Sequence, residues 1–392
     1  MNRSTYLLSL CQALLTTGNI LLVAITALIG KQLAPSSGLI TLPLALQFAG
    51  LMCATIPASM IMGWTGRQKG FFLGNGIGIL GAGVAIVALL NSDFSLFCVA
   101  TFLIGVGIGF GNLYRFAVIE TCDERYAARA ISIVMAGGVL AAVLGPNMAI
   151  QAQKLDWGAP FVPAFAGLLA LYVLALILLV FVQFKETSAE EKQLAQRPLL
   201  AIVLQPAYIT AVLAGMTSYA IMNLIMSATP LAMTHNGHHF NDAAIVIQWH
   251  VLGMFAPGFF TGQLINRWGV NNMMLAGGIL ILACIGINLT GESLWHYRIA
   301  LILLGVGWAF MFISATTSIT STYSPSEKPK AQAANEFLVF SSVVISSICS
   351  GWLVTDYGWA FINQVSIPFV VTAMLAIALL CRKPATAGQS NV

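Results

Sequence analysis

The sequence predicts an all-α integral membrane protein with twelve transmembrane helices in two related six-helix halves, and three observations predict it. Of 392 residues, 58% are hydrophobic and 8% are charged, against about 45–50% and about 25% in typical soluble domains. The charged residues are confined to short stretches between long apolar windows. Finally, segments late in the chain repeat segments that occur about 200 residues earlier.

The apolar windows give the positions of the helices. A transmembrane helix needs about 20 apolar residues, because the hydrocarbon core is about 30 Å thick and a helix rises about 1.5 Å per residue. A window over 331–355 contains one acid, Glu336. The other windows contain no Asp, Glu, Lys or Arg and cover residues 6–30, 38–64, 71–90, 95–114, 130–153, 158–184, 198–241, 243–266, 270–291, 299–326 and 364–381.

The basic residues predict the orientation. If the N-terminus is cytoplasmic, all Lys and Arg residues except Lys31, Lys154 and Arg298 fall in cytoplasmic segments. Cytoplasmic loops of membrane proteins carry an excess of Lys and Arg. This excess explains the net charge of +4, so the charge does not indicate a nucleic-acid partner. We therefore expect a multi-pass protein of the inner (cytoplasmic) membrane with both termini in the cytoplasm. The first window runs directly into further spans and is read as a retained helix.

A polar central segment divides the chain. Residues 185–197, KETSAEEKQLAQR, carry charges of both signs and interrupt the rhythm of short loops. We expect an N-terminal six-helix half over residues 1–184, a cytoplasmic linker over 185–205 and a C-terminal six-helix half over 206–392.

Two pairs of similar segments, which we call the sequence echoes, support a duplicated six-helix unit. IGVGIGF at 104–110 matches LGVGWAF at 304–310, and the loop that begins WTGR at 64–67 matches RWGV at 267–270. Such a spacing is what an internal repeat predicts. The glycines alone are weak indicators of function, because small residues let helices approach closely in lipid.

Twelve spans, a 6+6 repeat and a charged central loop resemble the major facilitator superfamily over nearly the whole chain. That family carries a conformational motif, G-x-x-x-D-R-x-G-R-R, between spans two and three. Gly66 and Arg67 match it here, whereas Gly63 and Trp64 replace the Asp and the residue after it. The copy in the second half keeps the pattern G-x-x-x-N-R-x-G through Gly262, Asn266, Arg267 and Gly269.

Further motifs narrow the resemblance. Gly145 and Pro146 stand in a context similar to the antiporter signature of the family, although three of its glycines are replaced. Thr101 occupies a position where many proton-coupled members have an Arg, so that route to proton coupling does not transfer. Four segments resemble the sequences of a bacterial subgroup of riboflavin-type transporters; they are LCQALLTTGN, LPLALQF, IQWHVLGMFAPGFFTG and NEFLVF.

Polar side chains within the spans are the candidate substrate ligands. Unpaired polar groups in lipid cost several kcal/mol, so they are expected to face a central cavity. Hydrogen bonding between helices is the alternative for the polar side chains. The two mid-membrane tryptophans suit either a flat aromatic ligand or, as the alternative, a lipid-facing or core-packing position. The candidates are Gln12, Thr16 and Asn19 on one face of span one, with Gln47, Tyr219, Asn223, Gln248, Trp249, His250 and Trp308.

Four residues are candidates for proton coupling or gating. Imidazole exchanges protons near neutral pH, which makes His250 a candidate, with a hydrogen-bonded core histidine as the alternative. Glu336, beside Asn335, is an acid within the inner half of span eleven. Arg115 could pair with Glu336 to close an inner gate, because breaking a buried pair costs about 3–5 kcal/mol; the alternative is that Arg115 reaches the lipid headgroups.

These features favour a secondary active transporter of a small organic solute that works by alternating access, acts as a monomer without a cofactor and is driven by protons. The resemblance to riboflavin-type transporters slightly favours uptake over export, with a flavin-like or other aromatic compound as the solute. Alternatives are a drug or metabolite exporter that exchanges protons, and a channel or non-transporting receptor. A membrane enzyme is disfavoured, because no catalytic cluster or ATP-binding loop occurs. Seven cysteines without CxxC and the loop HNGHH at 235–239 predict neither zinc nor another metal.

Overall fold

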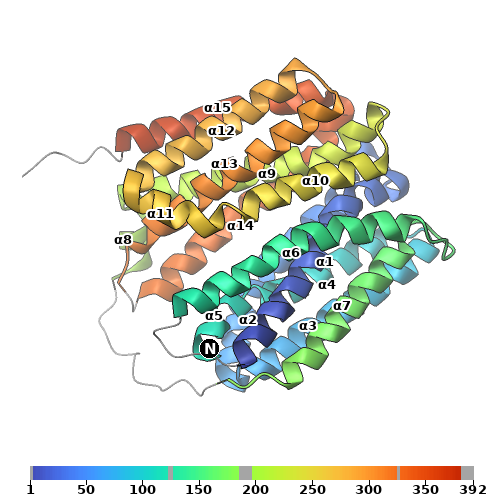
Figure 1. The fold of residues 1–392 in the computed structure, drawn as a ribbon, viewed down its shortest axis with the longest axis horizontal. Coiled ribbons are helices and arrows are strands. Elements are labelled where there is room, and N and C mark those ends of the chain that lie inside the picture. The colour runs from blue at the N-terminus through green and yellow to red at the C-terminus, as the bar shows by residue number, and fades with distance from the viewer. Residues whose placement is uncertain (1–2, 122–126, 185–196, 325–326, 381–392) are drawn as a thin grey trace, which may run out of the picture.

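The structure is a computed structural model, which describes residues 3–121, 127–184, 197–324 and 327–380. Over these residues the chain forms α-helices with two short 3-10 turns and no strand. Figure 1 shows the helices arranged as two bodies, one from the blue to green part of the chain and one from the yellow to red part. The predicted all-α fold is therefore confirmed.

The first body consists of α1 to α7. Within it α1 packs against α6, α2 and α3 pack against α4, and α7 packs against α3. Apolar residues fill these spans almost continuously, as expected for helices that meet lipid on one side and other helices on the rest. The helices are α1 (Arg3–Leu33), α2 (Leu42–Thr65), α3 (Arg67–Leu90), α4 (Phe94–Gly111), α5 (Tyr114–Ala117), α6 (Ala127–Gln153) and α7 (Val162–Val180), with 3-10 turns η1 (Ser37–Leu39) and η2 (Val118–Thr121).

The second body repeats this arrangement. Here α9 packs against α14, α10 and α12 pack against α13, and α15 packs against α12. The helices are α8 (Leu199–Val203), α9 (Pro206–His235), α10 (Phe240–Phe255), α11 (Gly258–Trp268), α12 (Val270–Thr290), α13 (Leu294–Thr320), α14 (Lys328–Asp356) and α15 (Gly358–Leu380). The short α8 lies within the segment that the sequence predicts as linker.

The predicted number of spans agrees with the helices. Among the described residues, ten helices are long and apolar enough to cross a membrane, and α10 with α11 forms a further span bent by 44°. The 27-residue α6 occupies the remaining fifth position, so the fold holds twelve membrane segments. The bend is a feature that the sequence windows did not predict. It falls at Pro257, which lacks the N–H that would continue the helix.

The glycine echoes have a common packing role. A Cβ atom built on Gly105 would lie 1.9 Å from the carbonyl oxygen of Gln47, and one on Gly305 would lie 2.3 Å from that of His250. Two residues later, Gly107 and Gly307 approach the backbone of α3 and α12 in the same way. The repeat therefore reproduces helix contacts in which only glycine fits.

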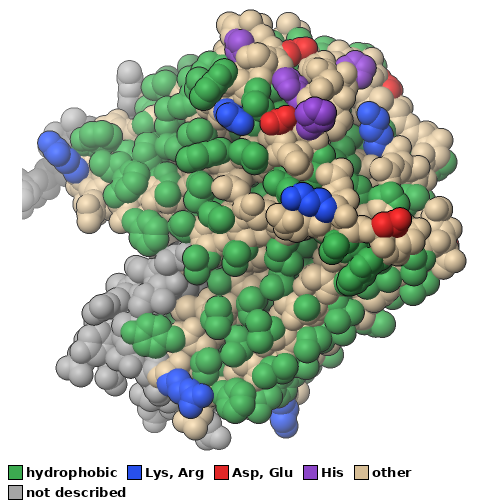
Figure 2. Space-filling model, turned by 45° about the vertical axis from the view of Figure 1, so that its right-hand side comes forward, with side chains coloured by type: hydrophobic (Ala, Val, Ile, Leu, Met, Phe, Trp, Pro, Cys, Tyr) green, Lys and Arg blue, Asp and Glu red, His purple; other side chains and the backbone are tan. Residues whose placement is uncertain are grey.

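The two bodies meet at one end of the molecule. We call the end at which α7 stops and α8 starts the linker end, and the opposite end the distal end. Near the distal end the Thr41 hydroxyl donates a 3.3 Å hydrogen bond to the Ile348 carbonyl and accepts a 3.0 Å bond from the Gly351 N–H. The rings of Phe161 and Phe240 also meet there, 5.8 Å apart. Figure 2 shows hydrophobic side chains over the surface of both bodies.

Candidate functional site

The polar face of α1 joins α1 to α2. The amide of Gln47, which is 1% exposed, donates a 2.7 Å hydrogen bond from Nε2 to Oδ1 of Asn19. Earlier on the same face, Gln12 Nε2 donates to Thr16 Oγ1 over 3.1 Å. The Oε1 atoms of Gln12 and Gln47 are buried and have no partner among the described residues. The face thus ties two helices together and still offers two unused acceptors.

His250 is fully buried between α10 and α13. Its Nδ1 lies 2.8 Å from the carbonyl oxygen of Leu301. Because a carbonyl only accepts hydrogen bonds, Nδ1 carries the proton. The other ring nitrogen, Nε2, is buried without a partner in the described part of the chain. His250 thus makes the hydrogen bond expected of a core histidine, and it also keeps one ring nitrogen unsatisfied.

Gln47 and His250 occupy equivalent positions in the two bodies. The backbone oxygen of each faces the first glycine of the echo, Gly105 in one body and Gly305 in the other. Each side chain makes one hydrogen bond and keeps one buried polar atom without a partner. Buried polar groups in proteins are nearly always satisfied, so the two unpartnered atoms are candidate positions for a bound water or a ligand group.

An aromatic cluster joins three helices of the second body. We define it as Tyr219 on α9, Trp308 and Phe312 on α13, and Phe340 on α14. Trp308 and Phe312 are stacked with ring centroids 5.0 Å apart. Tyr219 meets Trp308, Phe312 and Phe340 edge to face at 5.4, 5.3 and 5.9 Å. Tyr219 packs against two clusters of buried apolar side chains, each of which draws on both bodies.

The indole of Trp308 is 8% exposed, and its Nε1 atom is buried without an acceptor among the described residues. An indole N–H is a donor only, and leaving it unpaired is costly. The aromatic cluster therefore combines closely packed rings with one buried donor that is unused among the described residues.

The remaining substrate candidates differ in their surroundings. Asn223 is fully buried, and its Nδ2 donates to the hydroxyls of Ser346 and Ser347 over 2.9 and 2.7 Å, which ties α9 to α14. Gln248 accepts a 3.0 Å bond from Asn147, which joins α10 to α6 across the two bodies. Trp249 is 47% exposed. Asn223 has the environment of a helix tie, whereas Gln248 lies at the contact between the bodies.

The gating candidates lie at α14 and α5. Glu336 is half-buried and, with Met52, Thr55 and Phe340, lines a small pocket between α2 and α14 of about 20 Å³. Asn335 beside it is also half-buried. Arg115 belongs to α5, but its side chain lies outside the described residues. The Arg115–Glu336 pair therefore stays a prediction.

The conformational motif residues sit at helix ends. Gly66 separates α2 from α3 with φ of 91°, and Gly269 separates α11 from α12 with φ of 85°. Both angles lie in the left-handed region that glycine adopts without strain, so the two motif copies share one turn. Arg67 opens α3 beside Gly66, and its Nη1 lies 3.9 Å from the sulfur of Met62. Asn266 and Arg267 are exposed in the last turn of α11, and Gly262 has open space around it.

The residues of the antiporter-like signature lie within α6. A Cβ atom on Gly145 would lie 3.0 Å from the side chain of Ile20 and from the carbonyl oxygen of Thr17. Gly145 therefore lets α6 approach α1 closely. Pro146 follows inside the helix, where it removes a backbone hydrogen bond.

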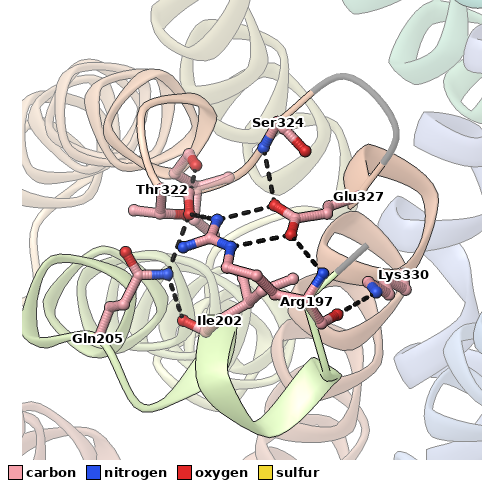
Figure 3. Close-up of polar contacts among 8 residues, drawn as sticks. Arg197, Ile202, Gln205, Thr322, Ser324, Glu327 and Lys330 are labelled. Atoms are coloured by element: carbon pink, nitrogen blue, oxygen red, sulfur yellow. Dashed lines mark hydrogen bonds and ion pairs between the residues drawn. The ribbon is translucent and has the colours of Figure 1, made fainter. Parts of the chain in front are cut away.

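An ion pair at the linker end was missed by the sequence analysis. Figure 3 shows Arg197, which precedes α8, against Glu327 at the start of α14. The guanidinium binds both carboxylate oxygens, at 2.8 and 2.7 Å, and the carbonyl of Thr322 at 3.0 Å. The Ser324 N–H donates to the same carboxylate over 2.9 Å, and Lys330 binds the carbonyl of Arg197. We call this arrangement the linker clamp.

The linker clamp fixes the protonation of its acid. Glu327 is 2% exposed, and the hydrogen bonds from Arg197 and then from Ser324 hold the pKa of its carboxyl well below the usual range. In turn, Glu327 raises the pKa of Arg197. The two residues are 130 positions apart, and no local sequence pattern predicts an ion pair over that separation.

Among the described residues, no group of three His, Cys, Asp or Glu side chains is placed to hold a metal ion. In the loop after α9, the ring nitrogen Nε2 of His238 is instead 2.9 Å from the carbonyl of Glu292. Its ring also meets that of Tyr297 edge to face.

Known proteins resemble this chain in sequence over nearly its whole length. The family model described as Major Facilitator Superfamily matches residues 8–321 and 211–392. The chain is 35% identical to the riboflavin transporter RfnT of Brucella anthropi over 99% of this chain and 98% of that protein. It is 28% identical to YddS, an uncharacterized MFS-type transporter of Bacillus subtilis, over 91% of this chain and 85% of that protein.

Solved structures share the fold at low identity. The nucleoside transporter NupG superposes with a TM-score of 0.73 at 11% identity, over 98% of this chain and all of that chain. A peptide transporter of the POT family superposes with a TM-score of 0.68 at 13% identity, over 100% of this chain and 99% of that chain. At such identities the likeness concerns the arrangement of the helices.

Proposed function

The chain belongs to the Major Facilitator Superfamily, and on that premise we propose that it imports a flat, ring-shaped solute of the flavin type. Membership makes it a multi-pass membrane transporter rather than an enzyme, as the sequence predicted. The choice of solute, the direction of transport, the coupling ion and the orientation are our proposals.

The aromatic cluster is the observation that carries the choice of solute. Trp308 and Phe312 are already stacked face to face, and the buried indole N–H has no acceptor in the described chain. A heteroaromatic ring with carbonyl groups would stack on these faces and accept that hydrogen bond. The relative from Brucella anthropi, which carries the name riboflavin transporter, supports a flavin as the first solute to test.

The acceptors on the other body complement the cluster. The Oε1 atoms of Gln12 and Gln47 are buried without donors among the described residues, and hydroxyl or imide groups of a solute would satisfy them. Sites of this kind lie between the repeats of secondary transporters, where rocking of one body against the other exposes them alternately.

The orientation follows from the basic residues. If the linker end is cytoplasmic, the contacts of Thr41 with α14 lie on the opposite side of the membrane and hold the two bodies together there. We place the protein in the inner membrane as a monomer, with both termini in the cytoplasm.

Protons are the proposed coupling ion, through His250 or Glu336. The unpartnered Nε2 of His250 is a free acceptor within the described chain, and Glu336 is a carboxyl in the inner half of α14. Neutral replacements, His250→Gln and Glu336→Gln, should abolish accumulation driven by a pH gradient and spare counterflow. Full accumulation in both variants would rule out these residues as the coupling groups.

The proposed inner gate is Arg115 with Glu336. If these residues close the cytoplasmic side as a pair, Arg115→Ala and Glu336→Gln should lower transport no further together than singly. Independent, additive losses in the double variant would show that the two side chains act separately.

The solute proposal is tested by riboflavin binding to purified protein. Trp308→Phe keeps a ring and removes the N–H, so the Kd should rise by about 2- to 12-fold, the equivalent of one hydrogen bond of about 0.5–1.5 kcal/mol. Trp308→Ala removes the stacking surface as well and should weaken binding further. Trp157→Ala, on a 54% exposed indole near a span end, is the matched control. Equal affinity for riboflavin in the wild type and both Trp308 variants would remove the aromatic cluster from the site.

A further inference from the structure

The distal end of the molecule contains a second pocket, separate from the aromatic cluster. Its volume is about 440 Å³, and its lining includes Lys31 at the end of α1, His235 and Asn236 at the end of α9, Glu292 before α13, Thr355 in α14 and Trp359 in α15. Pockets that bind small molecules measure about 300–1,000 Å³, so this distal pocket has the capacity for a solute.

We infer that the distal pocket is a capture site, which binds a neutral heteroaromatic solute with carbonyl and hydroxyl groups. The solute would bind there before it reaches the central site, the name we give to the proposed site at the aromatic cluster. The inference rests on the proposed function for the nature of the solute. It assigns the solute a second, superficial position on the same protein.

Trp359 provides the recognition group of the capture site. Its side chain is 4% exposed, and its Nε1 is buried with no acceptor among the described residues. Leaving a donor unpaired carries the full cost of removing it from water. A carbonyl group of a solute in the distal pocket would accept a hydrogen bond from this N–H.

The position of Trp359 is fixed from behind. Its ring lies 5.3 Å from that of Tyr297, at an interplanar angle of 50°. The hydroxyl of Tyr297 accepts a 2.9 Å hydrogen bond from Asn236, itself a residue of the pocket lining. Aromatic packing and this hydrogen bond hold the wall of the pocket in place, so little ordering is required when a ligand binds.

The rim of the pocket is polar and mixed in charge. Figure 2 shows histidines with acidic and basic side chains gathered on this part of the surface. Lys31 and Glu292 both line the pocket, and neither forms a salt bridge within the described residues. Lys31 offers donors and Glu292 offers acceptors. Such a rim suits a neutral solute that has both carbonyl and hydroxyl groups better than it suits an anion or a cation.

The capture site also bridges the two bodies. Lys31 belongs to the first body, whereas His235, Glu292 and Trp359 belong to the second. The contacts of Thr41 with α14 lie at this same end and keep the bodies together. Separation of the bodies at the distal end would therefore split the pocket and release its ligand toward the central site.

The number of bound ligands tests the inference, with riboflavin as the probe. Equilibrium dialysis should find two riboflavin molecules on each wild-type protein. On Trp359→Phe, which keeps the ring and loses the donor, one of the two sites should bind about 2- to 12-fold more weakly, the equivalent of one hydrogen bond. Lys31→Gln, a change at an exposed position, should weaken the same class of site. Trp295→Phe, at a 67% exposed residue of the same end, is the matched control and should bind as the wild type does.

The possible outcomes separate the two proposals. One riboflavin on the wild-type protein, lost in Trp308→Ala and retained in Trp359→Phe, would overturn the capture site and uphold the central site. Two molecules on Trp359→Phe with unchanged affinities would also overturn the capture site. One molecule whose binding is weakened only in Trp359→Phe would support the distal pocket and contradict the central site. Absence of binding to the wild type would overturn both.

Discussion

The hydrogen bond between Asn19 and Gln47 is the contact whose removal tests the polar face of α1 most sharply. Asn19→Ala leaves the Gln47 amide, 1% exposed, without the partner that it meets at 2.7 Å. Stranding a buried polar group costs about 1–3 kcal/mol, which corresponds to about a 5- to 150-fold change in the folding equilibrium.

A double-mutant cycle isolates the pair itself. Asn19→Ala, Gln47→Ala and the double variant should give a coupling free energy near 0.6 kcal/mol, and at most about 1.7 kcal/mol, as for hydrogen bonds within membrane proteins. The assay is reversible unfolding in mixed detergent, followed by tryptophan fluorescence. Asn91→Ala is the control, because Asn91 is exposed and its side chain bonds only its own helix.

The same variants also test the role of Gln47 in binding. Its unpartnered Oε1 predicts that Gln47→Ala weakens riboflavin binding as well as stability. Coupling indistinguishable from zero, together with unchanged stability of Asn19→Ala, would refute the contact. Normal riboflavin affinity in Gln47→Ala would leave Gln47 as a structural tie between α1 and α2.

Three further predictions follow from single positions. Gly105→Ala, whose Cβ would lie 1.9 Å from a backbone oxygen, should cost about 1–3 kcal/mol by overpacking, whereas Gly83→Ala, in open space, should not lower the thermal midpoint. Gly269→Ala forces φ of 85° on a residue with a Cβ and should cost about 1–2 kcal/mol, unlike Gly262→Ala. The lowered pKa of Glu327 stabilises the fold above its ordinary pKa of 4.5, so the difference in Tm between wild type and Glu327→Gln should shrink as pH falls below that value; a constant difference would contradict it.

The architecture could be predicted because lipid constrains it strongly. Backbone polar groups must be paired within each span, so the apolar windows determine the helices, and the repeat of 104–110 at 304–310 indicates the duplication. The bend at Pro257 was not predicted, because the window that contains it reads as one uninterrupted apolar stretch.

The candidate site could be predicted only in its residue types. Helical spacing placed Gln12, Thr16 and Asn19 on one face, but periodicity does not say which neighbour such a face meets. Asn223 shows this limit, since its hydroxyl partners lie more than 120 residues away. The linker clamp was missed for the same reason: Arg197 and Glu327 are 130 positions apart in the sequence.

Counterflow of radiolabelled riboflavin into liposomes that contain the purified protein and unlabelled riboflavin tests the central claim most directly. The account predicts saturable uptake of the label that is abolished or strongly reduced in Trp308→Ala and retained in Trp157→Ala. Uptake no greater than in protein-free liposomes, or a flux that rises without saturation as riboflavin is increased, would contradict it.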